Sequence, residues 1–408
     1  MTRESLSYIH AKIYGHKLTA SQIDEIIKDI VSGKLSDIQI AAFLGASAGD
    51  RFALSEIIHL TSSMIRVGQK LQWESDLVVD KHSVGGLPGN RTSLIVVPIV
   101  AACGLMIPKT SSRAITSPAG SADTMEVFAP VNLDLKKMKQ VVEKENGCVV
   151  WGGAVSLSPA DDILIRIEHE LDLDSEAQLV SSILSKKIAA GSNHILIDIP
   201  IGKTAKVRSQ RMAKVLRNYL ERTGKKLGVK VSVMFTDGSQ PVGRGIGPVL
   251  EAKDVLSVLR GEPSAPKNLR ERALDLAGRV LEFSPKIKKN TGRKIAEELL
   301  DSKRALKKFE MICEAQGGMR EIPTAQYTQP IISKSSGRIS SINNRHLASL
   351  AKLAGAPKTK TAGVEVLKSL DSSVEKDEPL FILHADTREE LEKAVNYSEQ
   401  NNIITIES

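Results

Sequence analysis

The chain has 408 residues, of which 41% are hydrophobic and 25% charged, and a net charge of +8. This length allows two or three domains with separate cores, and an aromatic content of 3% argues against a protein that stacks nucleic-acid bases. Three widely spaced cysteines exclude a disulfide framework and a Cys-rich metal site, and they fit the reducing cytoplasm.

The longest apolar run covers residues 94–107 and contains Pro98 and Gly104. It is too short to span a bilayer, so we expect no membrane partner. The positive net charge favours anionic ligands, although a solvated basic surface would give the same charge.

The first 68 residues are predicted to be helical. Isoleucine and valine recur at three- and four-residue steps from Ile23 to Val31, and Gly33 follows as a stop signal. The segments "DIQIAAFLGAS" and "LSEIIHLTSSMI" continue the pattern. Three short helices in sequence indicate a small all-α domain.

The pattern changes at about residue 75. A strand at 76–80 precedes a glycine-rich loop, a buried helix at 91–104, a strand at 105–110 and a second loop at 111–123. This alternation is typical of a parallel α/β sheet. Further strands are predicted at 147–153, 194–200 and 229–237.

The predicted fold class is α/β plus all-α, with a small helical domain, a larger mixed α/β domain and a small α+β C-terminal unit. Residues 157–190 are helical and interrupt the α/β pattern, and no internal repeat is apparent. The predicted domains are 1–68 plus 157–190 (all-α), 75–152 plus 191–334 (α/β, phosphate-binding) and 335–408 (α+β).

The first loop, "DKHSVGGLPGNRTS" at 80–93, has the composition of a phosphate cradle. Glycines let backbone N–H groups approach an anion at the N-terminus of the helix that follows. Lys81, Ser83, Thr92 and Ser93 could complete the cage, whereas a structural turn would need only the glycines. The loop matches neither the P-loop nor the dinucleotide-binding fingerprint.

The second loop, "SSRAITSPAGSAD", combines Arg113 with several hydroxyl groups. It follows the carboxyl end of a strand, where open α/β sheets place their ligands, although a serine cluster is also common in solvated turns. Within the first loop, His82 could be a hydrogen-bond donor or an acid, or a packing residue.

Asp172 and Asp174 precede a helix on which Ser182 and Lys186 lie one turn apart. The aspartates could cap this helix. The polar pair could line a cleft or face water.

Several ordered motifs resemble the thymidine and pyrimidine-nucleoside phosphorylases, with the AMP phosphorylases as a branch. They run from about residue 17 to residue 318 and include "DKHSVGG", "IPKTSSRAITSPAG", "SSILSKKIAAGSNHILIDI", "TDGSQPVGRGIGP" and "MICEAQGG". The resemblance implies a cleft between the helical and α/β domains, and a homodimer formed through the helical domain. It also implies attack of inorganic phosphate on the anomeric carbon of a nucleoside or nucleotide, which releases the base.

The resemblance also assigns roles to residues. It places the phosphate on Lys81, Ser83, Ser93, Ser111 and Ser121, and it makes His82, near the sugar, a candidate acid. Ser182 and Lys186 match base-binding positions, and Arg166 is the nearest counterpart of a base-binding arginine, with its spacing to Asp174 one residue off. Phosphate is a co-substrate, and no cofactor, metal or nucleic-acid partner is expected.

Other features of the sequence favour the AMP phosphorylase branch. In that branch Asp174 matches the proton donor to the base, and the nucleotide contacts fall on Gly86, Ser112, Arg113, Thr116, Ser117, Ser121, Ser182 and Lys206. A lysine at 206 could bind a 5′-phosphate. AMP phosphorylases carry an additional N-terminal domain, and this sequence starts about where that domain would end.

Thymidine, uridine and 5′-mononucleotides such as AMP therefore stay open as substrates. Two other classes are alternatives. A P-loop-type nucleotide hydrolase is suggested only by the glycine loop, and it lacks the Walker lysine. A non-catalytic nucleotide-binding or basic interaction protein is suggested by the net charge of +8.

Overall fold

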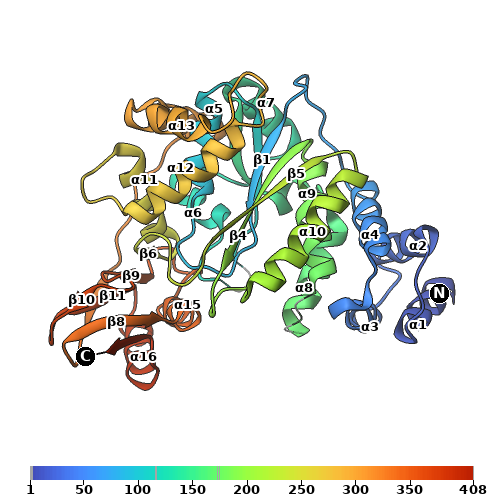
Figure 1. Cartoon of the computed structure of the whole chain (residues 1–408). Helices are drawn as coiled ribbons and strands as arrows, with labels where there is room; N and C mark the ends of the chain where they lie inside the picture. Colours follow the sequence, from blue (N-terminus) through green and yellow to red (C-terminus); the bar gives the residue numbers. More distant parts are fainter. Residues whose placement is uncertain (1–2, 115–116, 172, 174, 408) are drawn as a thin grey trace. The chain divides into compact units, whose positions relative to one another are not determined.

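The computed structural model describes residues 3–114, 117–171, 173 and 175–407 (Figure 1). The chain divides into two compact units. The first, which we call the helical unit, comprises Met1–Asp80, Gly152–Ile195 and Lys214–Val233. The second unit comprises Lys81–Trp151, Leu196–Ala213 and Met234–Ser408.

Helices form most of the helical unit. They are α1 (Arg3–Ile13), α2 (Ala20–Val31), α3 (Asp37–Ser47), α4 (Leu54–Arg66), α8 (Pro159–Leu171), α9 (Glu176–Ala189) and, from Lys214 onward, α10 (Gln210–Lys226). Helix α2 buries Ile23, Ile26, Ile27 and Ile30, which are the residues of the predicted apolar stripe. Capping boxes at Thr19 and Ser36 start α2 and α3.

Helix α1 lies in the span predicted to be helical, but it was not predicted as a separate helix. Its buried side chains include Ser5 and Lys12, which are polar and therefore weaken the apolar pattern on which a sequence prediction depends. Ser5 Oγ donates to Asp29 at 2.7 Å, and Lys12 Nζ donates to Glu56 at 2.8 Å. These partners satisfy both groups, so the helix packs through a polar face.

Two sheets belong to the α/β part. One has the order β1-β4-β5 and the other pairs β2 with β3 in parallel, with Ile107 opposite Gly147. The strands are β1 (Val79–Ser83), β2 (Ile107–Ser111), β3 (Gly147–Trp151), β4 (His194–Ile201) and β5 (Lys230–Asp237).

Helices follow and cover these strands. They are α5 (Ser93–Ala102), α6 (Ser121–Phe128), α7 (Leu135–Glu145), α10 (Gln210–Lys226), α11 (Pro248–Arg260), α12 (Lys267–Leu281), α13 (Gly292–Asp301) and α14 (Arg304–Gln316). Every residue of α5 up to Ala101 is buried, as its continuous apolar sequence predicts.

The C-terminal part of the second unit consists of two antiparallel sheets and two helices. The sheet order β6-β9-β11-β7 begins with the short strand β6 (Gly245–Ile246), and the other order is β10-β8-β12. The elements are β7 (Tyr327–Ile332), β8 (Gly337–Ile342), α15 (Asn344–Leu353), β9 (Gly363–Val366), β10 (Ser373–Val374), β11 (Pro379–Ala385), α16 (Arg388–Gln400) and β12 (Ile404–Glu407). Strand β7 lies before residue 335, where the α+β unit was predicted to begin. The predicted fold class is confirmed.

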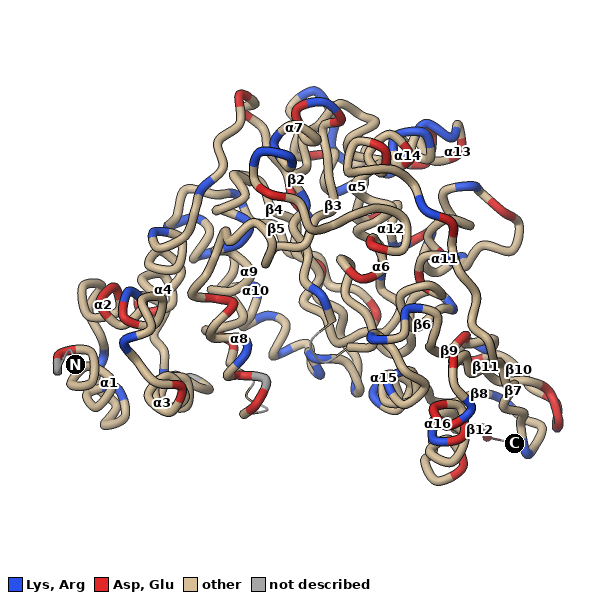
Figure 2. The backbone as a smooth tube through the Cα atoms, turned by 180° about the vertical axis from the view of Figure 1, so that it is seen from behind, with Lys and Arg blue, Asp and Glu red and all other residues tan. Residues whose placement is uncertain are grey.

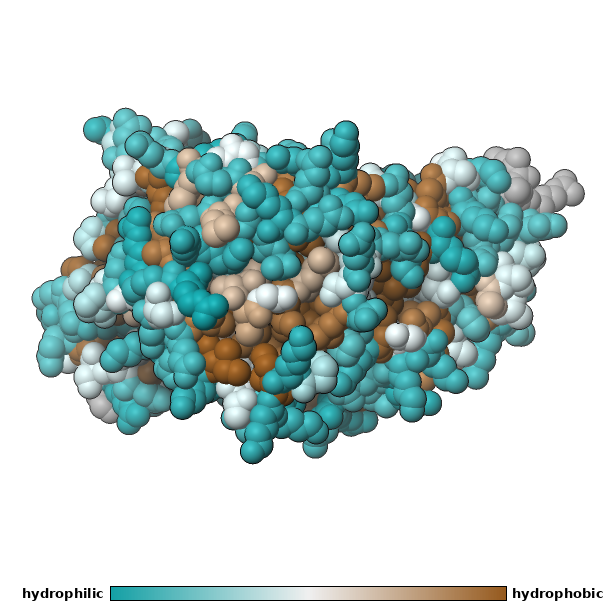
Figure 3. Space-filling view, turned by 90° about the horizontal axis from the view of Figure 1, so that it is seen from above, coloured by the Kyte–Doolittle hydropathy of each residue, from teal (hydrophilic) through white to brown (hydrophobic). Residues whose placement is uncertain are grey.

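Charged residues of both signs are interspersed along the chain (Figure 2). On the face in Figure 3, hydrophilic residues surround an area of hydrophobic ones. Among the described residues, no helix is both long and apolar enough to cross a membrane.

Candidate functional site

Two similar strand–loop–helix segments carry the predicted phosphate ligands. Each strand ends on a serine, and each helix begins on a serine. An offset of 28 residues relates Lys81 to Lys109, Ser83 to Ser111, and Ser93 to Ser121. The first turn of a helix leaves backbone N–H groups without a partner inside the helix. Here Leu94 and Ile95 donate to Arg91 and Thr92, and Ala122 donates to Ser112, so the other N–H groups of the two first turns are the potential anion donors.

The first loop is organised around Lys81, whose side chain is almost fully buried. Lys81 Nζ donates to Thr92 Oγ1 at 2.6 Å, and Thr92 Oγ1 donates to Asn90 Oδ1 at 3.2 Å. Ser83 Oγ donates to Asp198 Oδ2 at 2.9 Å and accepts from Asn90 Nδ2 at 3.1 Å. The Ser83 hydroxyl must therefore turn away from Asp198 before it can donate to an anion.

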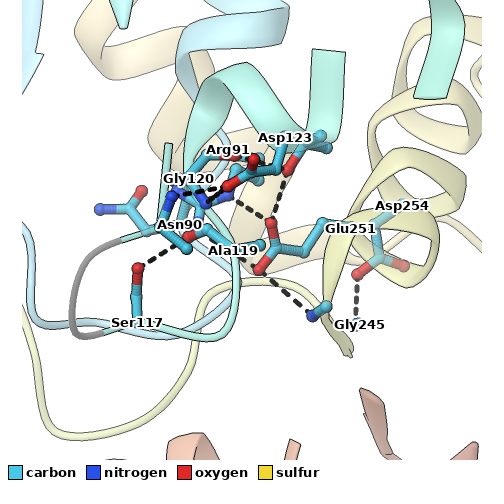
Figure 4. Close-up of polar contacts among 12 residues, drawn as sticks. Asn90, Arg91, Ser117, Ala119, Gly120, Asp123, Gly245, Glu251 and Asp254 are labelled. Atoms are coloured by element: carbon cyan, nitrogen blue, oxygen red, sulfur yellow. Dashed lines mark hydrogen bonds and ion pairs between the residues drawn. The ribbon is translucent and has the colours of Figure 1, made fainter. Parts of the chain in front are cut away.

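The second loop is closed by Asp123 of α6. Asp123 Oδ2 accepts from the backbone N–H groups of Ala114 at 2.6 Å and of Gly120 at 2.8 Å (Figure 4). A Cβ atom at Gly120 would lie 2.4 Å from the carbonyl oxygen of Ser112, so only glycine allows the ends of the loop to approach. One carboxylate thus sets the shape of the loop before Ser121.

Ser111 is the candidate ligand with an open hydrogen-bonding group. Its Oγ is buried and has no hydrogen-bond partner among the residues that the structure describes. Ser93 is also buried, and Ser121 is half-buried. A buried hydroxyl without a partner is costly in a native structure, so a ligand at this position would stabilise it.

Arg113, another predicted residue of the second loop, is bound by carboxylates. Arg113 donates to Glu126 at 2.8 and 2.9 Å and to Asp123 at 3.1 Å. The hydrogen bond to Glu126 raises the pKa of Arg113, and Arg113 lowers the pKa of Glu126 to about 2. Its charge is therefore neutralised within the protein.

Ser112 is exposed, and Ser117 Oγ donates to the carbonyl of Ala119 at 2.8 Å. Thr116 and Asp174 were also predicted as site residues, and both lie outside the described residues.

Gly86 and Lys206 come together in the second unit, as a nucleotide site would need. Gly86 has φ +75°, and a Cβ atom there would lie 2.7 Å from Lys206 Cβ. Glycine is therefore required where the loop passes Lys206. His82 is partly buried on β1, and the alternation of a strand places it on the face opposite to Lys81 and Ser83.

In the helical unit, the predicted base-binding cations both face carboxylates. Arg166 makes a two-pronged pair with Asp37 at 2.8 and 2.9 Å and is exposed. Lys186 pairs with the buried Asp161. Burial lowers the pKa of Lys186, but the charge of Asp161 and the hydrogen bond to it outweigh burial and leave this pKa raised. Ser182 is half-buried, one turn before Lys186.

Sequence reasoning missed the residues that shape the two loops. These are Asn90, Arg91, Asp123, Asp198 and Glu251. Asp123 alone had a local signal, because it occupies the third position of a helix that follows glycine. The structure groups no three or more His, Cys, Asp or Glu side chains in an arrangement suited to a metal ion, among the residues it describes.

Comparison with protein families gives three matches along the chain. The "Glycosyl transferase family, helical bundle domain" matches residues 6–68, and the "Glycosyl transferase family, a/b domain" matches residues 75–306. The "Pyrimidine nucleoside phosphorylase C-terminal domain" matches residues 338–405.

Curated relatives are similar over nearly the whole chain. A protein of Legionella pneumophila (strain Paris) named "Putative thymidine phosphorylase" is 62% identical over 96% of this chain and 76% of its own length. "Putative thymidine phosphorylase 1" of Acidovorax sp. (strain JS42) is 57% identical over 97% of this chain and 78% of its own length.

A solved structure shares the fold. It is the anthranilate phosphoribosyltransferase of Thermus thermophilus, with a TM-score of 0.64 and 19% identity. The match covers 76% of this chain and 99% of that one.

Proposed function

The chain belongs to the thymidine and pyrimidine-nucleoside phosphorylase family and is a glycosyltransferase, and from this premise we propose that it cleaves the N-glycosidic bond of a pyrimidine nucleoside or a nucleoside 5′-monophosphate with inorganic phosphate. With thymidine, the products would be thymine and 2-deoxyribose 1-phosphate.

The phosphate assignment depends on the buried Oγ of Ser111, which has no hydrogen-bond partner among the described residues. It lies at the end of β2, in a segment that repeats the arrangement of Lys81, Ser83 and Ser93. Phosphate is already anionic, so no side chain has to activate it by removing a proton. The protein has only to position it with hydroxyl, ammonium and backbone N–H donors.

The reaction forms a bond between a phosphate oxygen and the anomeric carbon while the bond to the base nitrogen breaks. The base leaves with the electron pair and requires a proton or hydrogen bonds. The anomeric carbon gains positive character, which the bound phosphate stabilises. We assign the proton to His82 or Asp174, and the contacts to the base to Ser182 and Lys186, as the family resemblance suggests.

A panel of substrates tests the proposal. Thymidine, uridine and AMP are each incubated with and without phosphate, and released bases are separated by chromatography. The expected result is base release that depends on phosphate and yields an equal amount of sugar 1-phosphate. Absence of release from every member would overturn the proposal, and magnesium-dependent release of phosphate would support a hydrolase.

A second candidate substrate class is the 5′-mononucleotides, such as AMP, which would give ribose 1,5-bisphosphate. The close approach of the Gly86 backbone to the backbone and Cβ of Lys206 favours it, because it brings a lysine residue to a glycine loop, and lysine is a common ligand of a phosphate monoester. Lys206→Ala should reduce turnover of AMP more than turnover of thymidine, and Lys203→Ala, at an exposed lysine nearby, is the control. Equal turnover of AMP by both variants would reject this role for Lys206.

We further propose that the protein acts as a homodimer in the cytoplasm, with contacts from the helical unit. Light scattering coupled to size-exclusion chromatography should give twice the chain mass of 44.2 kDa. A mass of one chain would reject the dimer.

A further inference from the structure

Arg91 connects the two loops. Its Nε donates to Glu251 Oε2, and its Nη2 donates to the carbonyl oxygen of Ala119 (Figure 4). Nη2 also lies 3.4 Å from Glu251 Oε1. Arg91 belongs to the first loop and is 8% exposed, whereas Ala119 belongs to the second loop. A single guanidinium therefore joins both loops to α11.

Glu251 of α11 is the other half of this connection, and it is 1% exposed. Its Oε2 accepts from Thr124 Oγ1 of α6 at 2.8 Å. Its Oε1 accepts from the backbone N–H of Gly247 at 3.4 Å. The carboxylate thus holds the first loop, α6 and the turn before α11 at one point.

Arg91 and Ala119 occupy corresponding places in the two strand–loop–helix segments. Arg91 lies two residues before Ser93, the first residue of α5, and Ala119 lies two residues before Ser121, the first residue of α6. The bond between Arg91 and Ala119 therefore acts close to the start of both helices.

We propose that the Arg91–Glu251 pair positions the two helix N-termini for inorganic phosphate and does not itself bind phosphate. The inference rests on the proposed function. The donors of Arg91 are directed at Glu251, at Ala119 and, through Nη1 at 3.5 Å, at the carbonyl of Asn90. Glu251 neutralises the guanidinium, so the pair supplies geometry and little net charge.

Arg91→Lys separates positioning from charge. Lysine keeps the positive charge but cannot bridge Glu251 and Ala119 with one planar group. In steady-state kinetics with the best nucleoside of the panel, we expect the KM for phosphate to rise about tenfold while the KM for the nucleoside changes by less than about twofold. The stabilisation of the protein by phosphate in thermal unfolding, without nucleoside, should fall in parallel.

Arg293→Lys is the matched control, because Arg293 also pairs with carboxylates in the second unit, namely Asp275 and Glu271. It should leave both KM values unchanged. An unchanged phosphate KM in Arg91→Lys would overturn the proposal. An equal rise in the nucleoside KM would also overturn it, because a general loss of structure acts on both substrates.

Thr124→Val provides a second test if Arg91→Lys does not fold, because it removes one hydrogen bond to Glu251 and keeps the shape of the side chain. The phosphate KM should rise about threefold, and no rise would overturn the proposal. Phosphate binding is read without turnover, so wild-type protein that is stabilised by phosphate but releases no base would overturn the proposed function alone. If the wild type turns over nucleoside and both variants have its phosphate KM, the positioning role alone would be overturned.

Discussion

In the helical unit, the cations Lys186 and Arg166 each face a carboxylate, whereas in the second unit Lys81 donates to the hydroxyl of Thr92 at the N-terminus of α5. A cation paired with Asp161 contributes little net field and suits an uncharged base. A buried lysine that donates to a threonine hydroxyl at a helix N-terminus suits an anion. The proposed function assigns the base to the helical unit and the phosphate to the second unit.

Lys81→Met tests the proposed phosphate site of the second unit, and its effect on turnover should be the largest. It removes a buried ammonium group, and loss of one positioned donor typically reduces turnover by about 100- to 1,000-fold. The measurement is kcat/KM for phosphate. Lys136→Met, at an exposed lysine of α7, is the control, and a Lys81 variant with the same value as this control would show that Lys81 does not act on phosphate.

Lys186→Met tests the neutralised pair of the helical unit. It leaves the buried carboxylate of Asp161 without its cation, which typically lowers the free energy of unfolding by about 3 kcal/mol. The double variant with Asp161→Asn should recover part of this loss in urea denaturation. Arg166→Ala should lower the free energy of unfolding much less, because that pair is exposed. Equal losses in the two single variants would contradict this contrast.

The order of elements could be predicted from the sequence because apolar periodicity is local. It predicted strands at 105–110 and 194–200, which are observed as β2 and β4, and a buried helix at 91–104, which is observed as α5. The residues that fix the two loops could not be predicted in this way. Asp198 lies 115 residues from Ser83, and Glu251 lies 160 residues from Arg91, so neither contact leaves a local pattern. Helix α1 escaped prediction as a separate helix for a related reason, since distant carboxylates compensate its buried Ser5 and Lys12.

The offset of 28 residues between the two segments was readable in the sequence, as Lys-His-Ser at 81–83 and Lys-Thr-Ser at 109–111. It is easily missed, because none of the nine residues that follow Ser83 is identical to its counterpart after Ser111. Its significance depends on knowing that both serines end strands and that both helices start ten residues later.

Asp254 extends the comparison to carboxylates. Asp161 neutralises a lysine, whereas Asp254 accepts from the backbone N–H groups of Arg244 at 2.6 Å and Gly245 at 2.7 Å. Burial raises the pKa of Asp254 to about 6, against these hydrogen bonds. Between about pH 4 and 6 the folded state therefore holds a proton that the unfolded state has lost, so raising the pH destabilises the protein.

Asp254→Asn should remove the part of the pH dependence of stability that comes from Asp254. The free energy of unfolding of the wild type should fall, relative to that of the variant, by about 2 kcal/mol from about pH 4 to about pH 6.5. Urea denaturation at several pH values measures the difference, and the variant is its own reference for all other titrating groups. Parallel pH profiles would show that Asp254 is ionised in the folded state throughout this range.

Variants of Ser111 and Ser83 compare the two loops of the proposed phosphate site. Their expected effects on stability are the smallest of those predicted. Ser111→Ala removes a buried hydroxyl that has no partner among the described residues, so it should not lower the free energy of unfolding and should raise it by up to about 1 kcal/mol. Ser83→Ala deletes the donor to Asp198 and the acceptor for Asn90, so it should cost about 1 kcal/mol. If both hydroxyls bind phosphate, each variant should raise the phosphate KM about tenfold, as kinetics would measure.

The two variants therefore share an effect on activity and differ in stability. A Ser111 variant that lost stability would mean that its hydroxyl has a structural partner. A Ser111 variant that kept both stability and phosphate affinity would remove Ser111 from the site. The second result would leave Ser121 as the remaining predicted phosphate ligand of the second segment.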